Sequence, residues 1–589
     1  MDPITNKKNY FGILLTGILL LIVLKPAQTA EPAILTITIE GVEGRLRENV
    51  EAHLGINRLA GEPIPSESRL RWLHARAEDE IRRALQPFGY YRPTIDTELE
   101  QTAEGWQARY RIAPGQPARI ATVDLRISGE GANDPTFKRI QASLPLTEGD
   151  VLEHRRYEDI KQALQSVAAE RGYFDARLLT SEIRVDLQAN SAFINLHFDT
   201  GDRYRLGQIT FHQDALAPEF LHRYLNFQPG DPYRASALLN LQSALIDSEY
   251  FSRVEVNAPL DRAEDEVIPV DIYLEPLSPR RYTVGLGFGT DTGVRGRFSV
   301  EARRINRRGH RYRINLLGSQ IRYSLTGEYI IPGADPRTDS YALRTGFSGE
   351  DSDVKDSQTA LIGVSWQRQE GRWLKVRSLD YQWERFRFGD EEQTTTLLIP
   401  RFNWTRVVPE DRLYVTEGSS ISLELRGAHD ALLSDVTFIQ GAARGKWIKT
   451  LTEDQDGRII LRGELGTTAI SQDFDRLPAS LRFFAGGDRS VRGYSLDSIG
   501  PRNEADDVIG GKHLVVGSLE YEHRLLENWS VAAFVDSGDA FDDTVDLKTG
   551  VGFGVRWLSP VGAVRVDLAS GLDEPGDTIR LHLSIGPDL

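Results

Sequence analysis

The stretch YTVGLGFG, Tyr282–Gly289, alternates strictly between two kinds of side chain. Apolar residues stand at every second position, with threonine or glycine between them: Tyr282, Val284, Leu286 and Phe288 form the apolar set. Near the end of the chain, VRVDL (564–568) and IRLHLSI (579–585) alternate in the same way, with polar or charged residues on the second face. Successive side chains of a strand point to opposite faces, so the pattern predicts strands that are apolar on one face only.

Alternation by itself fits both a soluble sandwich with apolar faces inward and a membrane barrel with apolar faces outward. Two further features favour the barrel. The strands reach about ten residues, the length needed to cross a bilayer at a tilt. The connections alternate between short ones (306–309, 370–372, 559–560) and longer ones (349–357, 537–546), as the turns and loops of outer-membrane barrels do.

Sixteen candidate strands follow one another after residue 280. They are expected to start near residues 281, 295, 310, 321, 338, 358, 372, 393, 416, 435, 457, 512, 529, 547, 561 and 578. An even number returns the end of the chain to the side from which it entered, and closure leaves no strand edge unpaired in lipid. The sequence therefore predicts an all-β 16-stranded transmembrane barrel over residues 278–589, with the lipid bilayer around it.

Composition narrows the class of protein. A mean hydropathy of -0.36 excludes a bundle of transmembrane helices but not a barrel, whose alternating strands average out. A net charge of -16 argues against nucleic acid as a partner, because phosphate binding needs a basic face. The chain has no cysteine, which removes disulfides, thiol catalysis and cysteine metal sites.

The N-terminal 30 residues have the pattern of an export signal. Two lysines, Lys7 and Lys8, precede the apolar run FGILLTGILLLIVL (11–24), which is shorter than the ~20 residues of a spanning helix. PAQTA follows and ends at Ala30, where cleavage is expected. The alternative is an uncleaved membrane anchor.

Residues 31–277 contain three copies of one unit with the order β-α-α-β-β. Each copy opens with a strand (34–42, 120–129, 206–214) and has a long amphipathic helix that ends at an aromatic pair: Tyr90-Tyr91, Tyr173-Phe174 and Tyr250-Phe251. TEGD (147–150) and QPGD (228–231) recur before the second and third long helices. An amphipathic helix must pack its apolar face on a sheet, so each copy is expected to be a small α+β domain.

These repeats resemble the POTRA domain, the polypeptide-transport-associated module of outer-membrane insertases. The resemblance implies three POTRA domains that bind unfolded clients or partner proteins by adding a strand at a sheet edge; the alternative is three rigid spacers. The expected organisation is a signal peptide (1–30), three POTRA domains (31–116, 117–201, 202–277) and the barrel (278–589).

One polar stretch interrupts the strands between residues 467 and 511. RFFAGGDRSVRGYSLDSIGP (482–501) resembles the VRGY/F loop motif of the insertase superfamily that includes BamA, TamA and the two-partner secretion transporters, and FVDSG (534–538) resembles its F-x-D-x-G strand motif. The resemblance implies that the loop folds back into the barrel and that its arginine meets the aspartate of the strand. The loop motif is Val491, Arg492, Gly493 and Tyr494, and the strand motif places Phe534, Asp536 and Gly538.

The parity of the strands supports this assignment. In WSVAAFVD (529–536) the apolar residues at odd positions face lipid, which places Phe534 and Asp536 in the lumen. By the same count, Glu520 and Glu522 also face inward, and a carboxylate-bearing lumen needs a cation, for which Arg492 is the candidate. We expect an internal Arg492–Asp536 pair with an architectural role, and exchanging the two residues should rescue function lost by single reversals if the contact is what matters. The alternative is a solvated external loop.

Enzyme activity is not expected. The Gly-rich GLGFG at 285–289 is followed by no helix that could cradle a phosphate, and the sequence has no G-x-S-x-G, H-E-x-x-H or zinc-like spacing among its 11 histidines. Glu520 and Asp536 would fit an acid–base pair, but a salt-bridged barrel wall explains them more simply. We expect no catalytic residue, metal or cofactor.

Within the superfamily, three repeats and the ending IRLHLSIGPDL resemble the TamA type. The resemblance implies a subunit that inserts or secretes autotransporters and other outer-membrane proteins without nucleotide, with a TamB-like inner-membrane-anchored partner. Alternatives are a BamA-like general insertase or a two-partner-secretion transporter and, outside this class, a passive channel or a receptor. A channel would conduct ions readily, whereas a barrel with its loop folded inward would not.

Such a machine needs a weak seam. The first strand carries Gly285, Gly287 and Gly289, which have no side chains to pack, and it is expected to pair weakly with the last strand. The seam residues predicted on the last strand are Ile579, Leu581, Leu583 and Ile585. This seam is the predicted lateral gate.

Overall fold

The computed structural model describes residues 34–559, 562–573 and 579–586, except 63, 65, 104, 389–390, 410–414 and 452–455. The predicted signal peptide, residues 1–30, lies outside the described residues. The chain divides into two compact units, Met1–Arg203 and Tyr204–Leu589. The boundaries predicted between the individual domains stay predictions.

The first unit contains two domains with the predicted β-α-α-β-β order. Their elements are β1 (Ile34–Glu40), α1 (Gly44–His53), α2 (Glu67–Leu85), β2 (Thr94–Thr102) and β3 (Gly105–Ala113), then β4 (Arg119–Ser128), α3 (Pro135–Ala142), α4 (His154–Arg171), β5 (Arg177–Asp186) and β6 (Ser191–Asp199). In each sheet the last strand is central, parallel to the first and antiparallel to the second. The apolar face of each long helix packs on its sheet, as its spacing predicts.

The second unit begins with the third copy. It consists of β7 (Arg205–His212), α5 (Pro218–Leu221), α6 (Ala235–Asp247), β8 (Phe251–Asn257) and β9 (Val267–Pro276), with strand order β7-β9-β8. The connections of both units also contain short 3-10 helices: η1 (Gly55–Leu59), η2 (Gln86–Phe88), η3 (Glu130–Asn133), η4 (His222–Tyr224), η5 (Leu260–Arg262), η6 (Phe474–Arg476) and η7 (Ala479–Leu481). Among the described residues, none of the helices has the length and apolar character needed to cross a bilayer.

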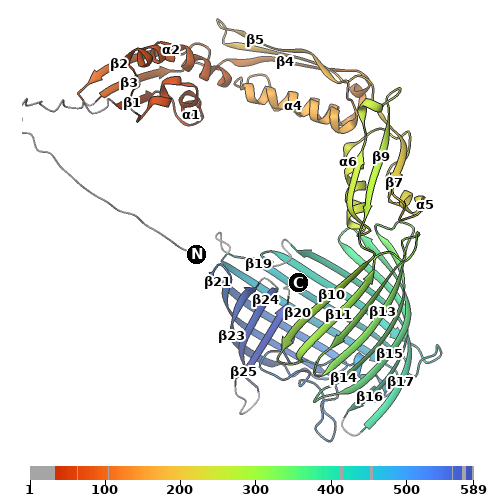
Figure 1. The fold of residues 1–589 in the computed structure, drawn as a ribbon. Helices are drawn as coiled ribbons and strands as arrows, with labels where there is room; N and C mark the ends of the chain where they lie inside the picture. The colour runs from red at the N-terminus through yellow and green to blue at the C-terminus, as the bar shows by residue number, and fades with distance from the viewer. Residues whose placement is uncertain are drawn as a thin grey trace, which may run out of the picture. The chain divides into compact units, whose positions relative to one another are not determined.

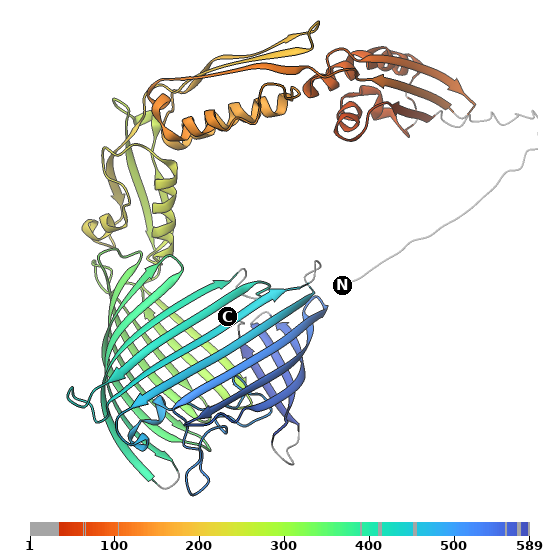
Figure 2. The same ribbon diagram turned by 180° about the vertical axis from the view of Figure 1, so that it is seen from behind.

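The rest of the second unit is a closed, antiparallel barrel in which each strand pairs with its neighbours in sequence (Figures 1 and 2). Its strands are β10 (Arg280–Gly289), β11 (Gly293–Ala302), β12 (Arg311–Gly318), β13 (Arg322–Pro332), β14 (Asp339–Asp351), β15 (Asp356–Glu370), β16 (Trp373–Phe388), β17 (Glu391–Pro409), β18 (Gly418–Ala428), β19 (Phe438–Thr450), β20 (Gly457–Ile470), β21 (His513–Leu526), β22 (Trp529–Phe541), β23 (Lys548–Ser559), β24 (Gly562–Gly571) and β25 (Arg580–Gly586). The 16-stranded prediction is confirmed, and the largest shift of a start is at β19, expected near residue 435 and found at Phe438.

The two faces of the wall are those that the alternation predicts. Outward residues of β10 are strongly exposed, up to 85% for Leu286, because only lipid would cover them. On β22 the outward Val535 is 39% exposed, whereas the inward Phe534 and Asp536 are 6% and 0% exposed. The carboxylates are therefore buried inside the barrel and the aliphatic groups face outward.

The connections differ from the prediction in one respect. Two of the loops expected to be long are short, because the flanking strands continue into them: β14 and β15 leave only 352–355, and β22 and β23 leave 542–547. Polar residues can extend a strand above the bilayer, where water solvates their outer faces. The loop between β20 and β21, residues 471–512, is not shortened in this way and is long, as expected.

The third POTRA domain packs directly on the turn between β11 and β12. The hydroxyl of Tyr250 donates a hydrogen bond of 2.5 Å to the carbonyl of Gly309 and accepts one of 3.0 Å from Nε of Arg311. The backbone N–H of Ala217 donates to the carbonyl of Arg307 at 2.8 Å. One end of the barrel is thus fixed to this domain.

Candidate functional site

The loop 471–512 lies against the inner face of the wall. Its buried apolar side chains form one cluster with inward residues of β21 and β22: Phe483, Ala485, Val491, Tyr494 and Ile499 with Leu514, Val516 and Ala540. The loop also pairs with itself, through bridges Phe483–Gly511 and Ala485–Ile499. Apolar burial and backbone pairing therefore hold the loop in a defined course.

Arg492 is at the centre of the site and is 5% exposed. Its Nε and Nη2 donate to the two carboxylate oxygens of Asp536 at 2.6 and 3.0 Å, and its backbone N–H donates to the same group at 3.1 Å. Its Nη1 donates to Glu520 at 2.8 Å and to Asp567 at 3.1 Å. One guanidinium thus joins carboxylates on three strands, β21, β22 and β24.

Arg492 and Asp536 are in contact, and two further carboxylates share the same guanidinium. Because Arg492 also bonds Glu520 and Asp567, an exchange of the two residues would place a carboxylate at position 492 facing two others. This geometry argues against rescue by the exchange, which stays a prediction.

The wall also supplies its own cations, which the sequence reasoning missed. Arg556 on β23 donates to Glu520 at 2.6 Å, to Glu522 at 3.2 Å and to Asp567. Arg458 on β20 donates to Glu522 at 2.7 Å. These arginines face inward by the same alternation that placed Glu520, so parity applied to β20 and β23 would have found them.

The three residues of the strand motif lie side by side on the lumen face of β22, and each meets the loop differently. The ring of Phe534 lies 3.3 Å from the guanidinium carbon of Arg492, as in a cation–π contact. Asp536 accepts the bidentate bonds. A Cβ at Gly538 would lie 3.1 Å from a methyl group of Val491 and 2.8 Å from one of Val516, so the absence of a side chain leaves room for the loop.

Glycine is also required where the loop turns past the wall. Gly493 has a φ of +96°, and a Cβ there would lie 2.7 Å from the backbone of Ser570 and Gly571. A Cβ at Gly550 would lie 1.8 Å from the carbonyl oxygen of Arg492. Tyr494, 1% exposed, then donates to the carbonyl of Thr549 at 3.3 Å. The loop backbone is therefore in direct contact with β23 and β24.

The predicted seam joins β10 and β25. Among the described residues, the two strands share one backbone pair, Gly289 with Ser584, whereas the other neighbouring barrel strands pair over seven residues or more. The N–H of Thr290 adds a bond of 3.3 Å to the carbonyl of Leu583. Gly285 and Gly287 have no partner residue on β25 within the described part of the chain, and neither do Ile579, Leu581 and Ile585 on β10.

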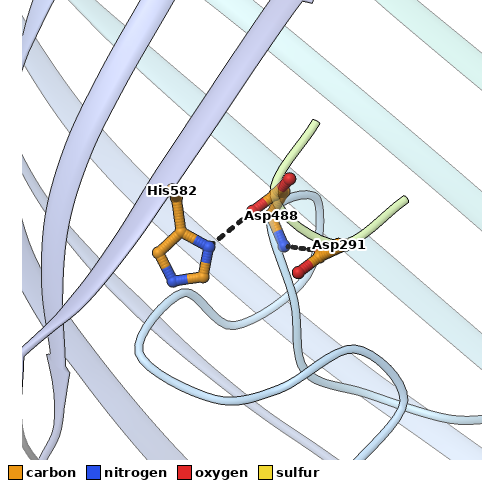
Figure 3. A group of neighbouring side chains, drawn as sticks. All are labelled: Asp291, Asp488 and His582. Carbon is orange, nitrogen blue, oxygen red and sulfur yellow. Dashed lines mark hydrogen bonds and ion pairs between the residues drawn. The ribbon is translucent and has the colours of Figure 1, made fainter. Parts of the chain in front are cut away.

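One group in the described residues lies close enough to share a metal ion: Asp291, Asp488 and His582, whose ligand atoms are all within 4.8 Å of one another (Figure 3). Both ring nitrogens of His582 are already in hydrogen bonds. Nε2 accepts from the N–H of Gly493 at 3.0 Å, and Nδ1 faces the carboxylate of Asp488. With its lone pair already used, this histidine is better described as part of a hydrogen-bond network than as a metal ligand.

This fold and this interior loop define a class of protein. In this class, three POTRA domains precede a 16-stranded outer-membrane barrel, and one loop of the barrel is buried in its interior. A family model described as the Omp85 superfamily domain matches residues 281–588, which is more than half of the chain. The chain belongs to the Omp85 superfamily. It is an outer-membrane protein with its POTRA domains in the periplasm.

The N-terminal half matches family models as well. The model described as POTRA domain TamA domain 1 matches residues 36–114. The POTRA model described as surface antigen variable number repeat matches residues 124–201 and 204–276. The resemblance to POTRA repeats, drawn from the aromatic junctions, is confirmed.

Relatives with curated names are outer membrane protein assembly factors. BamA of Nitratidesulfovibrio vulgaris is 23% identical over 378 residues, 60% of this chain and 47% of the relative. BamA of Neisseria meningitidis serogroup B is 22% identical over 181 residues, 28% of this chain and 22% of the relative. The chain thus spans less than half the length of these relatives.

A solved structure shares the fold. The crystal structure of BamA from Haemophilus ducreyi lacking POTRA domains 1–3 aligns with a TM-score of 0.66 at 17% identity and covers 80% of this chain and 99% of that chain.

Proposed function

We propose that this protein assembles other outer-membrane proteins, inserting or secreting autotransporters and other β-barrel clients through the seam between β10 and β25. The observation that carries the proposal is the single backbone pair, Gly289 with Ser584, that joins the two strands among the described residues. Among the described residues, the other neighbouring barrel strands pair over seven residues or more, so the seam is where a strand is most readily added. Curated relatives named as assembly factors support the same activity.

The energy for assembly comes from the client. An unpaired strand in lipid leaves its backbone N–H and C=O groups unsatisfied, at several kcal/mol for each group. A client strand that pairs with the free edge of β10 satisfies those groups, as in strand addition to other exposed sheet edges. No nucleotide is required at any step.

The interior site has an architectural role in this proposal. Arg492 and Arg556 cross-link carboxylates on β21, β22 and β24, so this arc of wall stays rigid while the seam beside it changes. A rigid arc next to a weak seam confines opening to one place.

We further propose the TamA type of assembly protein, with a TamB-like inner-membrane-anchored partner that binds the POTRA domains. The match of the first domain to the TamA domain model supports this choice over a BamA-like general insertase or a two-partner-secretion transporter. Retention by residues 31–277 of a large inner-membrane-anchored protein from envelope extract would support it further.

The seam is tested by locking it. Gly289→Cys with Ser584→Cys places two cysteines at the one paired position, in a chain that has no other cysteine. We expect the oxidised protein to lose most of its assembly of an autotransporter client into lipid vesicles, by at least about tenfold, and the reduced protein to retain it. The readout is the protease-resistant, folded client.

A matched control locks strands that are already fully paired. Ser348→Cys with Thr359→Cys joins β14 to β15, and its oxidation should leave client assembly unchanged. Full assembly by the oxidised seam variant would refute the lateral gate, whereas a parent protein that assembles no client would favour a channel or receptor.

A further inference from the structure

Asp488, on the interior loop, lies between His582 on β25 and Asp291 in the turn after β10 (Figure 3). Its carboxylate accepts a hydrogen bond of 3.0 Å from the hydroxyl of Thr290, the residue that follows β10, and one from His582 on β25. Its backbone N–H donates to Asp291 in the turn between β10 and β11 at 2.6 Å. One loop residue therefore contacts both sides of the seam.

The proton on His582 can be assigned from its neighbours. The N–H of Gly493 donates to Nε2 at 3.0 Å, so Nε2 carries a lone pair and the proton of the neutral ring is on Nδ1. Nδ1–H then donates to Asp488, a charge-assisted bond in a side chain that is 5% exposed. His582 on the last strand is thus bonded to two loop residues, Asp488 and Gly493.

Thr290 forms a second link at the same point. Its hydroxyl, besides donating to Asp488, accepts from the N–H of Leu583 on β25 at 3.1 Å. The hydroxyl of Thr290 thus accepts from the N–H of Leu583 in place of a backbone carbonyl of a neighbouring strand. The carboxylate of Asp488 orients that hydroxyl so that its lone pair faces β25.

A side chain crosses the seam at Gly287. Arg295 on β11 pairs with Gly287 and extends past it to the last strand, where its Nη2 donates to the carbonyl of Ile585 at 3.0 Å. A Cβ at Gly287 would lie 2.7 Å from Nε of Arg295. Gly287, expected to weaken strand pairing, thus leaves room for the hydrogen bond from Arg295 to Ile585 across the seam.

We propose that Asp488 is the latch of the seam: the interior loop holds β10 and β25 together through side chains, in place of the backbone ladder that the two strands lack. Displacement of residues 486–493 would break the bonds to Thr290 and His582 together. Among the described residues, the backbone pair of Gly289 with Ser584, the bonds between Thr290 and Leu583 and the bond from Arg295 to Ile585 would remain to hold the strands. Displacement of the loop and opening of the seam are therefore coupled.

This inference deepens the proposed function, since a latch matters for assembly only if the seam is used. The test therefore measures the seam itself, in lipid and without any client. Spin labels are attached to Leu286→Cys on β10 and Phe553→Cys on β23, which lie three strands apart across the seam on exposed, lipid-facing positions. The interspin distance distribution is recorded by pulsed electron paramagnetic resonance in lipid nanodiscs.

We expect Asp488→Ala to shift or broaden that distribution toward longer distances by about 5 Å, one strand spacing. Asp475→Ala, the same change at an exposed position of the same loop, should leave it as in the parent. A label pair away from the seam, Leu343→Cys on β14 and Phe402→Cys on β17, should not change in any variant.

A parent-like distribution for folded Asp488→Ala overturns the latch. If Asp488→Ala fails to fold, Thr290→Val removes the hydroxyl at the same link and keeps the side-chain shape; lengthening supports the latch, and a parent-like distribution overturns it. A seam that lengthens in these variants while the locked protein still assembles clients would leave the latch standing and refute the proposed function.

Discussion

At the scale of the residue, Arg492 shows why a guanidinium is needed at this position. Its side chain makes four hydrogen bonds to three carboxylates, two of them to Asp536. A lysine has three donors on one atom and cannot span Asp536 and Asp567 together. A lysine at position 492 would keep the positive charge but would lose the hydrogen bonds that join the three carboxylates.

Arg492→Lys is therefore expected to lower the free energy of unfolding of the barrel by about 2 kcal/mol, the range for hydrogen bonds to charged groups. The measurement is denaturation of the barrel by guanidinium chloride in lipid vesicles, followed by tryptophan fluorescence. Arg502→Lys is the control: it lies in the same loop with its side chain 46% exposed, and we expect a change within about 0.5 kcal/mol. Equal effects of the two variants would show that the Arg492 network is not specific.

The sequence predicts part of this site and misses part of it for a physical reason. Alternation places Glu520 and Asp536 in the lumen because it is a local property of each strand. The contact of Arg492 with Asp567, 75 residues further along the chain, exists only once β24 has closed beside β22 and β23. Partners set by closure have no local signal, and the same holds for Asp488 and His582.

At the scale of the element, strands are predictable and loops are not. Each barrel strand carries its own two-residue period, so its start can be read from the sequence to within a few residues. The loop 471–512 has no period, and its place inside the barrel was expected only from the VRGY resemblance and from the parity of its partner strand. Its course depends on Gly493, Gly538 and Gly550, which are informative only once the wall is beside them.

The turn between β11 and β12 gives an element-scale prediction. Gly309 has a φ of +76°, and a Cβ there would lie 2.4 Å from the ring of Phe220 and 2.9 Å from the hydroxyl of Tyr250. Gly309→Ala should therefore loosen the third POTRA domain from the barrel. We expect at least about tenfold faster hydrogen exchange in α5 and η4, measured on the full chain in nanodiscs.

Gly371 provides the matched control for that variant. It has a φ of +57° in the turn between β15 and β16, and a Cβ there would have no other atom within 4 Å. Gly371→Ala thus imposes similar backbone strain without the clash, and exchange in α5 should not change. If both variants accelerate exchange equally, strain in the turns explains the effect and the docking contact does not.

At the scale of the whole molecule, the aromatic pairs that mark the repeats also connect domains. Tyr250 bonds the barrel turn at Gly309, and Tyr91 packs against the core of the second POTRA domain, with its hydroxyl 2.6 Å from Nε2 of His154. Tyr173 instead stays in its own domain, near Asp134. The sequence indicates that these residues close a core but not which domain the core belongs to.

The link between Tyr91 and His154 predicts a pH dependence. Burial lowers the pKa of His154, against a smaller opposing effect of Glu158. A histidine whose folded pKa lies below its unfolded value of about 6.5 binds protons more readily when the structure opens. The interface between the first two POTRA domains should therefore keep its full stability above about pH 6.5 and lose stability as the pH falls below that value.

Hydrogen exchange of residues 114–119 in the full chain measures this interface, because the N–H of Ala118 donates across it to the carbonyl of Gly89 at 2.8 Å. After correction for intrinsic rates, we expect protection to fall between pH 7.5 and pH 5.5. His154→Gln should abolish the dependence, since glutamine does not titrate, whereas His53→Gln at an exposed position should preserve it. Unchanged protection of the parent across this range would exclude His154 as the group that couples proton binding to the arrangement of the two domains.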